Sequence, residues 1–120
     1  DYRPKNVGTE KLKKHDGELS IELERTDDIL AWLGSNKKPS QFLCGFSMET
    51  QNMLENSRAK LEKKKLDMIC ANNLRTEGAG FGIDTNVVTI ITASNEEELP
   101  VMTKDQVAEK ILDAIKEMMG

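Results

Sequence analysis

The chain has 120 residues, of which 32% are charged, 38% are hydrophobic and 4% are aromatic, and its formal net charge is −4. This length fits a single domain with a core of ordinary size, and no apolar run approaches the roughly 20 residues that a membrane-spanning helix needs. Two cysteines and one histidine are too few for a structural zinc site.

The charge is unevenly distributed along the chain. Residues 1–65 carry a net charge of +2, whereas residues 66–120 carry −6. A chain that is acidic overall is a poor general binder of nucleic acid, although a local basic patch remains available for a small anion. No secretory signal or membrane segment is visible. We therefore expect a cytoplasmic protein with no nucleic-acid or membrane partner, in which Cys44 and Cys70 are buried reduced thiols.

The first part of the chain is expected to form a loop and then a hairpin. Residues 1–10 are polar and favour a loop. From Leu19 to Leu23 apolar and polar residues alternate, which is the period of a half-buried strand. Asp16-Gly17 precedes this run and is a hairpin signal, so residues 11–24 are expected to form a hairpin.

A short helix is expected next. Thr26 or Asp27 is a suitable cap for it. Four apolar residues follow at helical spacing, namely Ile29, Leu30, Trp32 and Leu33. Gly34 is expected to end the helix, because glycine is common just past a helix C-terminus.

The middle of the chain predicts a strand–helix–strand unit. Residues 42–46 form a continuous apolar run, which is typical of a strand covered on both faces, as in a parallel sheet. Thr50 is expected to cap the following helix, whose inner stripe would be Met53, Leu54, Ser57 and Leu61. Residues 66–71 are expected to form the next strand, parallel to the first.

The last third of the chain predicts a strand of opposite direction and a helix. Residues 86–92 are rich in β-branched side chains, and no helix fits before them, so we expect an antiparallel strand. Residues 94–98 are expected to be an acidic turn. Thr103 and Gln106 have the spacing of a capping box. An amphipathic helix follows, with the apolar face Val107, Ala108, Ile111, Leu112 and Ile115.

Two segments have the composition of an anion site. Gly78, Gly80 and Gly82 are similar to a phosphate loop, but no helix follows them, so a turn that needs positive φ angles is the preferred interpretation. Lys60 and Lys64 are four residues apart, which places them on the same rim of the predicted helix. A solvated helix C-terminus and an anionic ligand both explain these lysines, and spacing alone leaves both interpretations open.

Six segments of the chain, in order, resemble motifs of bacterial phosphopantothenate–cysteine ligase, also called phosphopantothenoylcysteine synthetase. They are Asp1-Tyr2-Arg3-Pro4, Glu10-Lys11-Leu12-Lys13-Lys14, Thr26-Asp27-Asp28-Ile29-Leu30, Gly45-Phe46-Ser47-Met48-Glu49-Thr50, Met68-Ile69-Cys70-Ala71-Asn72-Asn73 and Gly80-Phe81-Gly82-Ile83-Asp84-Thr85-Asn86. Their order and spacing fit across all 120 residues. This enzyme is often the C-terminal half of a protein fused to a flavin-dependent phosphopantothenoylcysteine decarboxylase.

The resemblance implies a fold and a reaction. The fold would be α/β, the C-terminal portion of a three-layer Rossmann/ribokinase-like domain, with a mostly parallel sheet and one antiparallel strand at about residues 86–92. The reaction would be the CTP-dependent ligation of 4′-phosphopantothenate with L-cysteine in coenzyme A biosynthesis, assisted by Mg²⁺, through an acyl-cytidylate. It would yield 4′-phospho-N-pantothenoylcysteine, CMP and diphosphate. FMN would be bound only by a fused decarboxylase domain outside this chain.

The resemblance also implies site residues. The nucleotide-binding positions would be Asp1, Lys11, Asp27, Asp28, Ile29, Leu30, Phe46, Lys60 and Lys64. Lys11 would also be the catalytic position, near the triphosphate. Asp27 stands where the family usually has proline, and Asn73 stands where aspartate is usual. The metal ligands are not implied.

The resemblance also implies how the domain is completed and assembled. Residues 1–120 would be the CTP-binding portion of one ligase domain, whose N-terminal half is expected upstream of Asp1, so the chain alone is expected to be inactive. Residues 11–24 would be a dimerisation or flap hairpin, which implies a homodimer, and a fused decarboxylase would allow a higher assembly. The alternative is a noncatalytic nucleotide-binding or protein-interaction module on the same half-fold. The sequence does not distinguish CTP from ATP.

Overall fold

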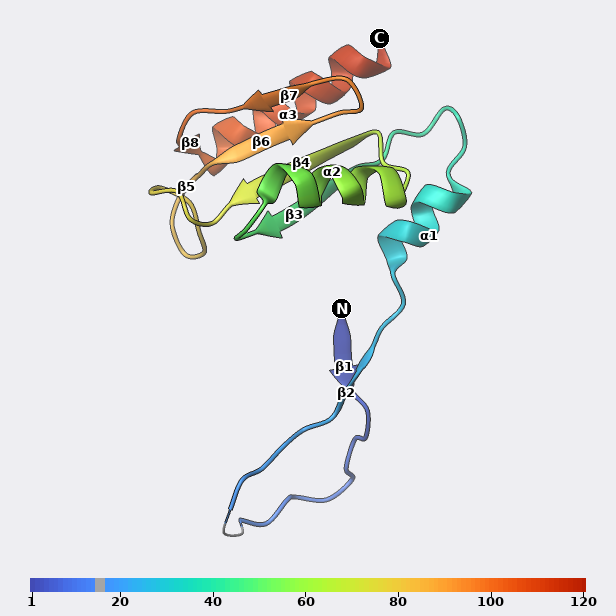
Figure 1. The fold of residues 1–120 in the computed structure, drawn as a ribbon, viewed down its shortest axis with the longest axis vertical. Helices are drawn as coiled ribbons and strands as arrows, with labels where there is room; N and C mark the ends of the chain where they lie inside the picture. The colour runs from blue at the N-terminus through green and yellow to red at the C-terminus, as the bar shows by residue number, and fades with distance from the viewer. Residues whose placement is uncertain (15–16) are drawn as a thin grey trace.

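The computed structural model describes residues 1–14 and 17–120. The elements are, in chain order, β1 (Tyr2–Pro4), β2 (Leu23–Arg25), α1 (Ile29–Asn36), β3 (Cys44–Glu49), α2 (Met53–Lys63), β4 (Met68–Asn73), β5 (Thr85–Asn86), β6 (Val88–Ile91), β7 (Glu96–Glu98), β8 (Met102–Thr103) and α3 (Lys104–Met119). Figure 1 shows two regions. The arm, residues 1–28, holds β1 and β2 and extends away from the body, residues 29–120, which holds the main sheet and the helices.

The main sheet has four strands in the order β3-β4-β6-β7. β3 and β4 are parallel, whereas β6 is antiparallel to both β4 and β7. Strands β3, β4 and β7 therefore run in one direction and β6 in the other. This confirms the antiparallel strand predicted at residues 86–92 and a mixed α/β fold, although only the β3–β4 pair is parallel.

The sheet carries a helix on each face. Successive residues of the central strand β4 point to opposite faces. Met68 belongs to a buried cluster with Val107 of α3, whereas the next residue, Ile69, belongs to a second cluster with Leu61 of α2. Figure 1 accordingly shows α2 and α3 on opposite sides of the sheet. Burial on both faces explains the continuous apolar run that predicted this strand.

The predicted acidic turn at residues 94–98 is wrong, because Glu96–Glu98 form the edge strand β7. The turn that precedes this strand is shorter than the predicted one, and in it the Thr92 amide donates a hydrogen bond to the Asn95 carbonyl over 2.9 Å. The three glutamate side chains are exposed, so backbone pairing with β6 rather than burial makes this segment a strand. Charged side chains on an edge strand also oppose pairing with another chain.

The helix α1 has different boundaries from those predicted. Its cap is Asp28, whose carboxylate accepts a hydrogen bond from the Ala31 amide over 3.0 Å, rather than Thr26 or Asp27. The helix also continues past Gly34. The glycine is there because the backbone of another helix approaches it closely, and not because the helix ends.

The predicted inner stripe of α2 is confirmed in part. The helix begins after Asn52 rather than after Thr50. Ser57 and Leu61 are buried, but Leu54 is 41% exposed. Because α2 packs mainly on β3 and β4, the covered part of the helix is narrower than its apolar face.

The helix α3 begins at the predicted capping box, in which Thr103 and Gln106 satisfy each other's backbone amides. Val107 and Ile111 are buried as predicted, whereas Leu112 is 65% exposed. The same reason applies as for α2, because a single sheet face covers only the central stripe of a helix that lies on it.

The glycine-rich segment is a turn, as predicted. Gly78, Gly80 and Gly82 all have positive φ angles, which side chains rarely adopt. The short strand β5 follows this turn and pairs with β8. A phosphate loop needs a helix N-terminus at this point, and none is present.

The arm is held by a short ladder that the sequence did not predict. β1 is antiparallel to β2, with Tyr2 opposite Arg25, so the loop expected over residues 1–10 contains a strand. Three residues in each strand are too few to show a hydrophobic period. The ladder is completed by an ion pair of 2.8 Å between Arg3 and Glu24.

The predicted hairpin over residues 11–24 is not formed as a strand pair. Among the described residues between β1 and β2 there is no strand, and Asp16 of the predicted turn lies outside the described residues. Leu19 and Ile21 are 66% and 68% exposed. The alternation that predicted a strand therefore has no layer to cover it, which removes the reason for a strand to form.

The arm makes the molecule long and leaves apolar side chains exposed. The radius of gyration is 18.4 Å, whereas a compact chain of this length would have about 14 Å. The exposed apolar residues of the arm are Tyr2, Val7, Leu12, Leu19, Ile21 and Leu23. An extended segment with this surface is not stabilised by its own contacts.

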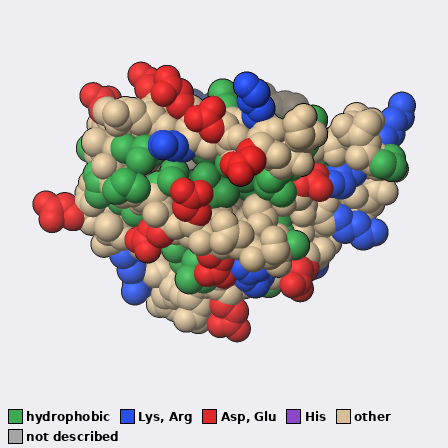
Figure 2. Space-filling view, turned by 90° about the horizontal axis from the view of Figure 1, so that it is seen from above, with side chains coloured by type: hydrophobic (Ala, Val, Ile, Leu, Met, Phe, Trp, Pro, Cys, Tyr) green, Lys and Arg blue, Asp and Glu red, His purple; other side chains and the backbone are tan. Residues whose placement is uncertain are grey.

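One face of the molecule carries mixed acidic and hydrophobic side chains (Figure 2). Figure 2, which views the molecule from above relative to Figure 1, shows Asp and Glu side chains spread among hydrophobic ones, with Lys and Arg at separate positions. None of the helices in the described residues has the length and apolar character needed to cross a membrane.

Candidate functional site

The ladder between β1 and β2 brings the start of the chain to the start of α1. The Thr26 amide donates a hydrogen bond to the Asp1 carbonyl over 2.8 Å. Asp1 and the segment 27–30, which are distant in sequence, consequently line the same cavity. The arm therefore supplies one wall of a site.

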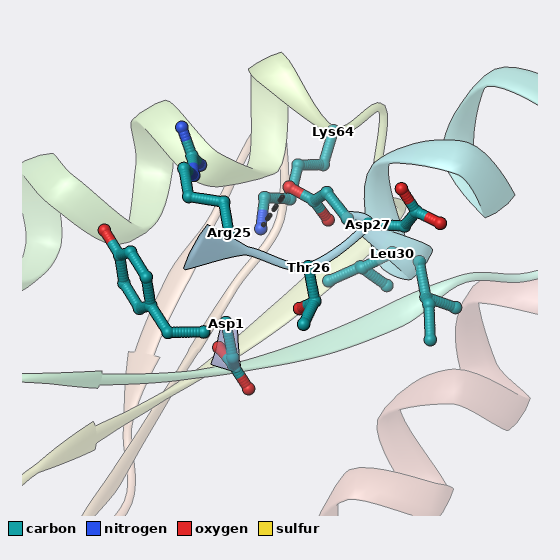
Figure 3. Close-up of a pocket in the computed structure, with 9 residues that line it drawn as sticks. Asp1, Arg25, Thr26, Asp27, Leu30 and Lys64 are labelled. Atoms are coloured by element: carbon teal, nitrogen blue, oxygen red, sulfur yellow. Dashed lines mark ion pairs between the residues drawn. The ribbon is translucent and has the colours of Figure 1, made fainter. Parts of the chain in front are cut away.

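Lys64 supplies the opposite wall from the end of α2. Its Nζ lies 3.3 Å from the Asp28 carboxylate, and Figure 3 shows this ion pair with Asp1 and Thr26 around the same space. The cavity has a volume of about 430 Å³ and is lined by Asp1, Tyr2, Arg25, Thr26, Asp27, Asp28, Ile29, Leu30 and Lys64. A volume of a few hundred Å³ is typical of small-molecule sites.

Backbone contacts fix the position of Lys64. Lys65 has a left-handed conformation with a φ of 56°, and the Leu66 amide donates back to the Leu61 carbonyl over 2.9 Å, as in a Schellman motif. Gly34 of α1 packs against the Lys64 carbonyl so closely that an added Cβ would lie 1.7 Å from this oxygen. The C-terminal part of α1 is thus in direct contact with the C-terminal end of α2. This contact fixes the two helices relative to each other, and so holds Asp28, at the start of α1, within reach of the Lys64 side chain.

Asp28 is ionised at neutral pH. The hydrogen bond from the Ala31 amide, reinforced by Lys64, lowers the pKa of the Asp28 carboxyl below its ordinary value of 3.8. Its place at the N-terminus of α1 also favours the anion, because the helix dipole is positive there. The cavity therefore contains the ion pair between Asp28 and Lys64, and Asp1 and Asp27 add two further acidic side chains.

Most of the predicted nucleotide residues meet at this cavity. Six of the nine line it, namely Asp1, Asp27, Asp28, Ile29, Leu30 and Lys64. Lys11 does not, because it lies on the exposed connection between β1 and β2. Phe46 does not either: it is 63% exposed and points to the face of β3 opposite to that of its neighbour Ser47, which contacts α2.

Lys60 lies one helical turn before Lys64 and has a different partner. Its Nζ is 2.6 Å from Oε1 of Glu49, at the carboxyl end of β3. The Lys60 side chain is 43% exposed and that of Glu49 is 14% exposed. The two lysines that the sequence placed on one rim therefore share a helix, but each is paired with its own carboxylate.

Sequence reasoning missed four residues of this region. Tyr2, Arg25 and Thr26 reach the cavity only through the β1–β2 ladder, which was not predicted. Glu49 lies within one of the motifs that carried the resemblance, but nothing in the sequence identified it as the partner of Lys60. Spacing along one helix predicts which lysines are neighbours, but it does not predict a partner on a strand.

The two cysteines are free, and their sulfur atoms lie 3.8 Å apart. The hydrogen bond from Cys70 lowers the pKa of the Cys44 thiol, and the same contact, together with burial, raises the pKa of Cys70. Cys70 is buried, whereas Cys44 is only partly so. The prediction of buried reduced thiols is thus met in full by Cys70 alone.

No preformed metal cage exists in the part of the chain that the structure describes, since no three His, Cys, Asp or Glu side chains gather closely enough to hold an ion. Asp1, Asp27 and Asp28 line one cavity without converging on a point. One or two of these carboxylates fit the usual Mg²⁺ arrangement, in which substrate phosphates and waters complete the coordination.

Comparison with known proteins places this chain in a family. Residues 1–119 match the family model described as the DNA/pantothenate metabolism flavoprotein C-terminal domain. The chain is 48% identical over 116 residues to the coenzyme A biosynthesis bifunctional protein CoaBC of Bacillus subtilis (strain 168), covering 96% of this chain and 28% of that protein. It is 43% identical over 116 residues to a cysteine/cysteine sulfinic acid decarboxylase of an unknown prokaryotic organism, covering 96% of this chain and 32% of that protein.

A solved structure agrees with these matches. The chain is similar to the crystal structure of the C-terminal domain of the coenzyme A biosynthesis bifunctional protein CoaBC, with a TM-score of 0.75 and 39% identity, covering 99% of this chain and 50% of that one. The chain spans about a third or less of the length of the two curated relatives. The resemblance predicted from the motifs is confirmed, and the chain belongs to the family of the DNA/pantothenate metabolism flavoprotein C-terminal domain.

Proposed function

We propose that this chain is the CTP-binding part of a phosphopantothenate–cysteine ligase that acts in coenzyme A biosynthesis. The observation that carries the proposal is the convergence of Asp1, residues 27–30 and Lys64 on one cavity of about 430 Å³. These residues are among the nucleotide-binding positions that the ligase resemblance implies. The relative from Bacillus subtilis, named for coenzyme A biosynthesis, supports the pathway.

The proposed reaction joins a carboxylate and an amine in two steps. The carboxylate of 4′-phosphopantothenate attacks the α-phosphorus of CTP, which forms an acyl-cytidylate and releases diphosphate. The amino group of L-cysteine then attacks the acyl carbon and releases CMP. Chemistry of this kind depends on positioning and on stabilising charge at phosphoryl oxygens, rather than on a protein nucleophile.

Lys64 is the residue of this chain best placed to stabilise such charge. An ammonium group has three N–H donors, and the ion pair with Asp28 leaves others for phosphoryl oxygens. Lys60, four residues earlier on the same helix, extends the positive charge along α2. A triphosphate bound by both lysines would therefore follow this side of the helix, with its nucleoside toward the apolar side chains of Ile29 and Leu30.

Mg²⁺ is proposed to arrive with the nucleotide. The acidic residues Asp1, Asp27 and Asp28 line the cavity and would supply one or two of its ligands. Bound in this way, the ion supplies Lewis-acid stabilisation of the phosphoryl oxygens.

Lys11 is proposed to act across a homodimer. It belongs to the arm, whose apolar side chains are exposed, and none of the described residues in the connection between β1 and β2 lines the cavity. A second copy packed on residues 11–24 would cover this apolar surface and bring a Lys11 side chain to the nucleotide site.

The remainder of the ligase fold is proposed to pack beside β3. Among the described residues, this strand has a neighbour on one side only, and its Phe46 and Met48 side chains are 63% and 55% exposed. Upstream residues would add further strands here and complete a three-layer Rossmann/ribokinase-like sheet. The edge of a sheet is the natural place for such an extension, because its backbone groups are unpaired.

The test is a ligation assay on the full-length protein with CTP, 4′-phosphopantothenate, L-cysteine and Mg²⁺. Diphosphate release and the mass of the product are measured together, with ATP in place of CTP as a control. Lys64→Gln is expected to reduce kcat/KM for CTP by at least roughly tenfold, the loss typical of a charged hydrogen bond. The matched control is Lys116→Gln, which removes an exposed lysine of α3 and is expected to leave kcat/KM unchanged.

Two results would contradict the proposal. Turnover with ATP but not CTP would overturn the choice of nucleotide. Absence of ligation with both nucleotides in a folded protein would favour the noncatalytic nucleotide-binding or interaction module.

A further inference from the structure

Glu49 is an unusually enclosed carboxylate. Among the ion pairs in the described part of the chain, its side chain is 14% exposed, whereas the acidic partners of the other pairs are between 32% and 44% exposed. Withdrawing a carboxylate from water costs free energy unless other groups stabilise its charge. The partners of Glu49 therefore identify what this position does.

Both carboxylate oxygens of Glu49 face side chains of α2. Oε1 accepts a hydrogen bond from Lys60 Nζ over 2.6 Å, and Oε2 accepts one from Asn56 Nδ2 over 3.5 Å. Asn56 and Lys60 are four residues apart, so they lie on one side of the helix. Helical side chains lean toward the helix N-terminus, which directs the long Lys60 side chain to the strand end that carries Glu49.

A buried contact fixes the strand and the helix relative to each other. Ser47 and Ser57 are 4% and 0% exposed, and their hydroxyl oxygens are 2.8 Å apart. Ser47 lies two residues before Glu49 on the same face of β3, and Ser57 lies one helical turn before Lys60. The distance between the Glu49 carboxylate and the Lys60 ammonium is thus set by the packing of β3 against α2.

We propose that Glu49 is a positioning residue, which holds the Lys60 ammonium in the orientation that binds a phosphoryl group of the nucleotide. This inference rests on the proposed function. Lys60 gives one N–H to Glu49 and keeps two for phosphoryl oxygens. Because the side chain is already held in place, less conformational entropy is lost when the nucleotide binds. Glu49 itself acts through Lys60 and contacts no substrate.

If Glu49 instead competes with phosphate for Lys60, a different result is expected. If the carboxylate only competed with phosphate for Lys60, its removal would strengthen nucleotide binding, because the competing charge and its repulsion of phosphate would be gone. A positioning role predicts weaker binding. The sign of the change in KM therefore distinguishes the two.

The experiment is steady-state kinetics of the full-length protein with CTP varied, on Glu49→Gln, Lys60→Gln and the double variant. Glu49→Gln is expected to raise KM for CTP roughly tenfold with little change in kcat, as expected when binding is weakened equally in ground and transition states. The double variant is expected to be no worse than Lys60→Gln alone, because Glu49 has no effect without Lys60.

The matched control is Glu96→Gln. It removes another carboxylate that pairs with α2, through Arg58, but it leaves Lys60 untouched. This variant is expected to retain the KM of the unaltered protein. If Glu49→Gln does not fold, Glu49→Asp serves instead, since it keeps the charge and moves it by one methylene group, and a several-fold higher KM is expected.

Three results would overturn the inference. They are an unchanged KM for CTP in Glu49→Gln or its Asp substitute, a lower KM, or losses that add in the double variant. Normal turnover of the unaltered protein together with any of these rejects the role of Glu49 alone. No CTP-dependent turnover in the unaltered protein would reject the proposed function, and this inference with it.

Discussion

The body and the arm both contain hydrophobic patterns that predict strands, but these patterns lie in opposite environments. In the body, Ile69 and Ile91 are 1% and 0% exposed, because α2 covers their face of the sheet. In the arm, Leu19 and Ile21 are 66% and 68% exposed, although they alternate with polar residues as strand residues do. The comparison teaches that a hydrophobic pattern typical of a strand specifies a strand only where another layer of the protein covers it.

The largest expected difference between the two regions is in the cost of removing an apolar side chain. Ile69→Ala is expected to lower the free energy of unfolding by about 2–5 kcal/mol, because it leaves a cavity in the core. Leu19→Ala is expected to change it by less than about 0.5 kcal/mol. Urea denaturation of both variants, at a concentration where the chain is monomeric, measures these values. A large cost for Leu19→Ala would show that the arm is packed, contrary to its exposure here.

The contact between α1 and α2 within the body provides the next test. Gly34→Ala is expected to lower the free energy of unfolding by about 1–3 kcal/mol, the usual cost of overpacking, because its Cβ would collide with the Lys64 carbonyl. Gly8→Ala in the arm is the control: its Cβ would lie 3.6 Å from the nearest atom, and a change within about 0.5 kcal/mol is expected. Equal values for the two variants would contradict the close approach of α1 to α2.

The smallest expected effect concerns the ionisation of Asp28. Its pKa in the folded chain is lowered below 3.8, so the ionised form stabilises the folded state above pH 3.8, and this stabilisation is lost as the pH falls through the folded pKa. An NMR titration of the Asp28 carboxyl carbon should give a midpoint below 3.8, and Lys64→Gln should raise this midpoint only in part, since the Ala31 amide remains. A midpoint at or above 3.8 would contradict the observed cap and ion pair.

The sequence predicted the body better than the arm for a physical reason. The strands at β3, β4 and β6 and the helix α3 show patterns long enough to reveal which faces are covered. The acidic edge strand β7 and the three-residue strands of the arm are formed by backbone pairing, which leaves no hydrophobic signal. Gly34 was interpreted as a helix end, because a close contact between two backbones cannot be recognised without knowing which elements meet.

The candidate site was likewise predictable only in part. The helical spacing of Lys60 and Lys64 identified two neighbouring cations, and the resemblance named six of the residues that line the cavity. The carboxylates with which the lysines pair, Glu49 and Asp28, are tertiary partners. Which carboxylate meets which lysine depends on how α2 packs against β3 and α1, and a single sequence carries no direct record of this.

The most direct test of the account is calorimetric titration of CTP, with Mg²⁺, into the full-length protein and its Lys64→Gln variant. We expect that the unaltered protein binds CTP more tightly than ATP and that Lys64→Gln weakens CTP binding by at least roughly tenfold. Equal affinity of the two proteins for CTP would contradict the assignment of the cavity between the arm and α2 as the nucleotide site.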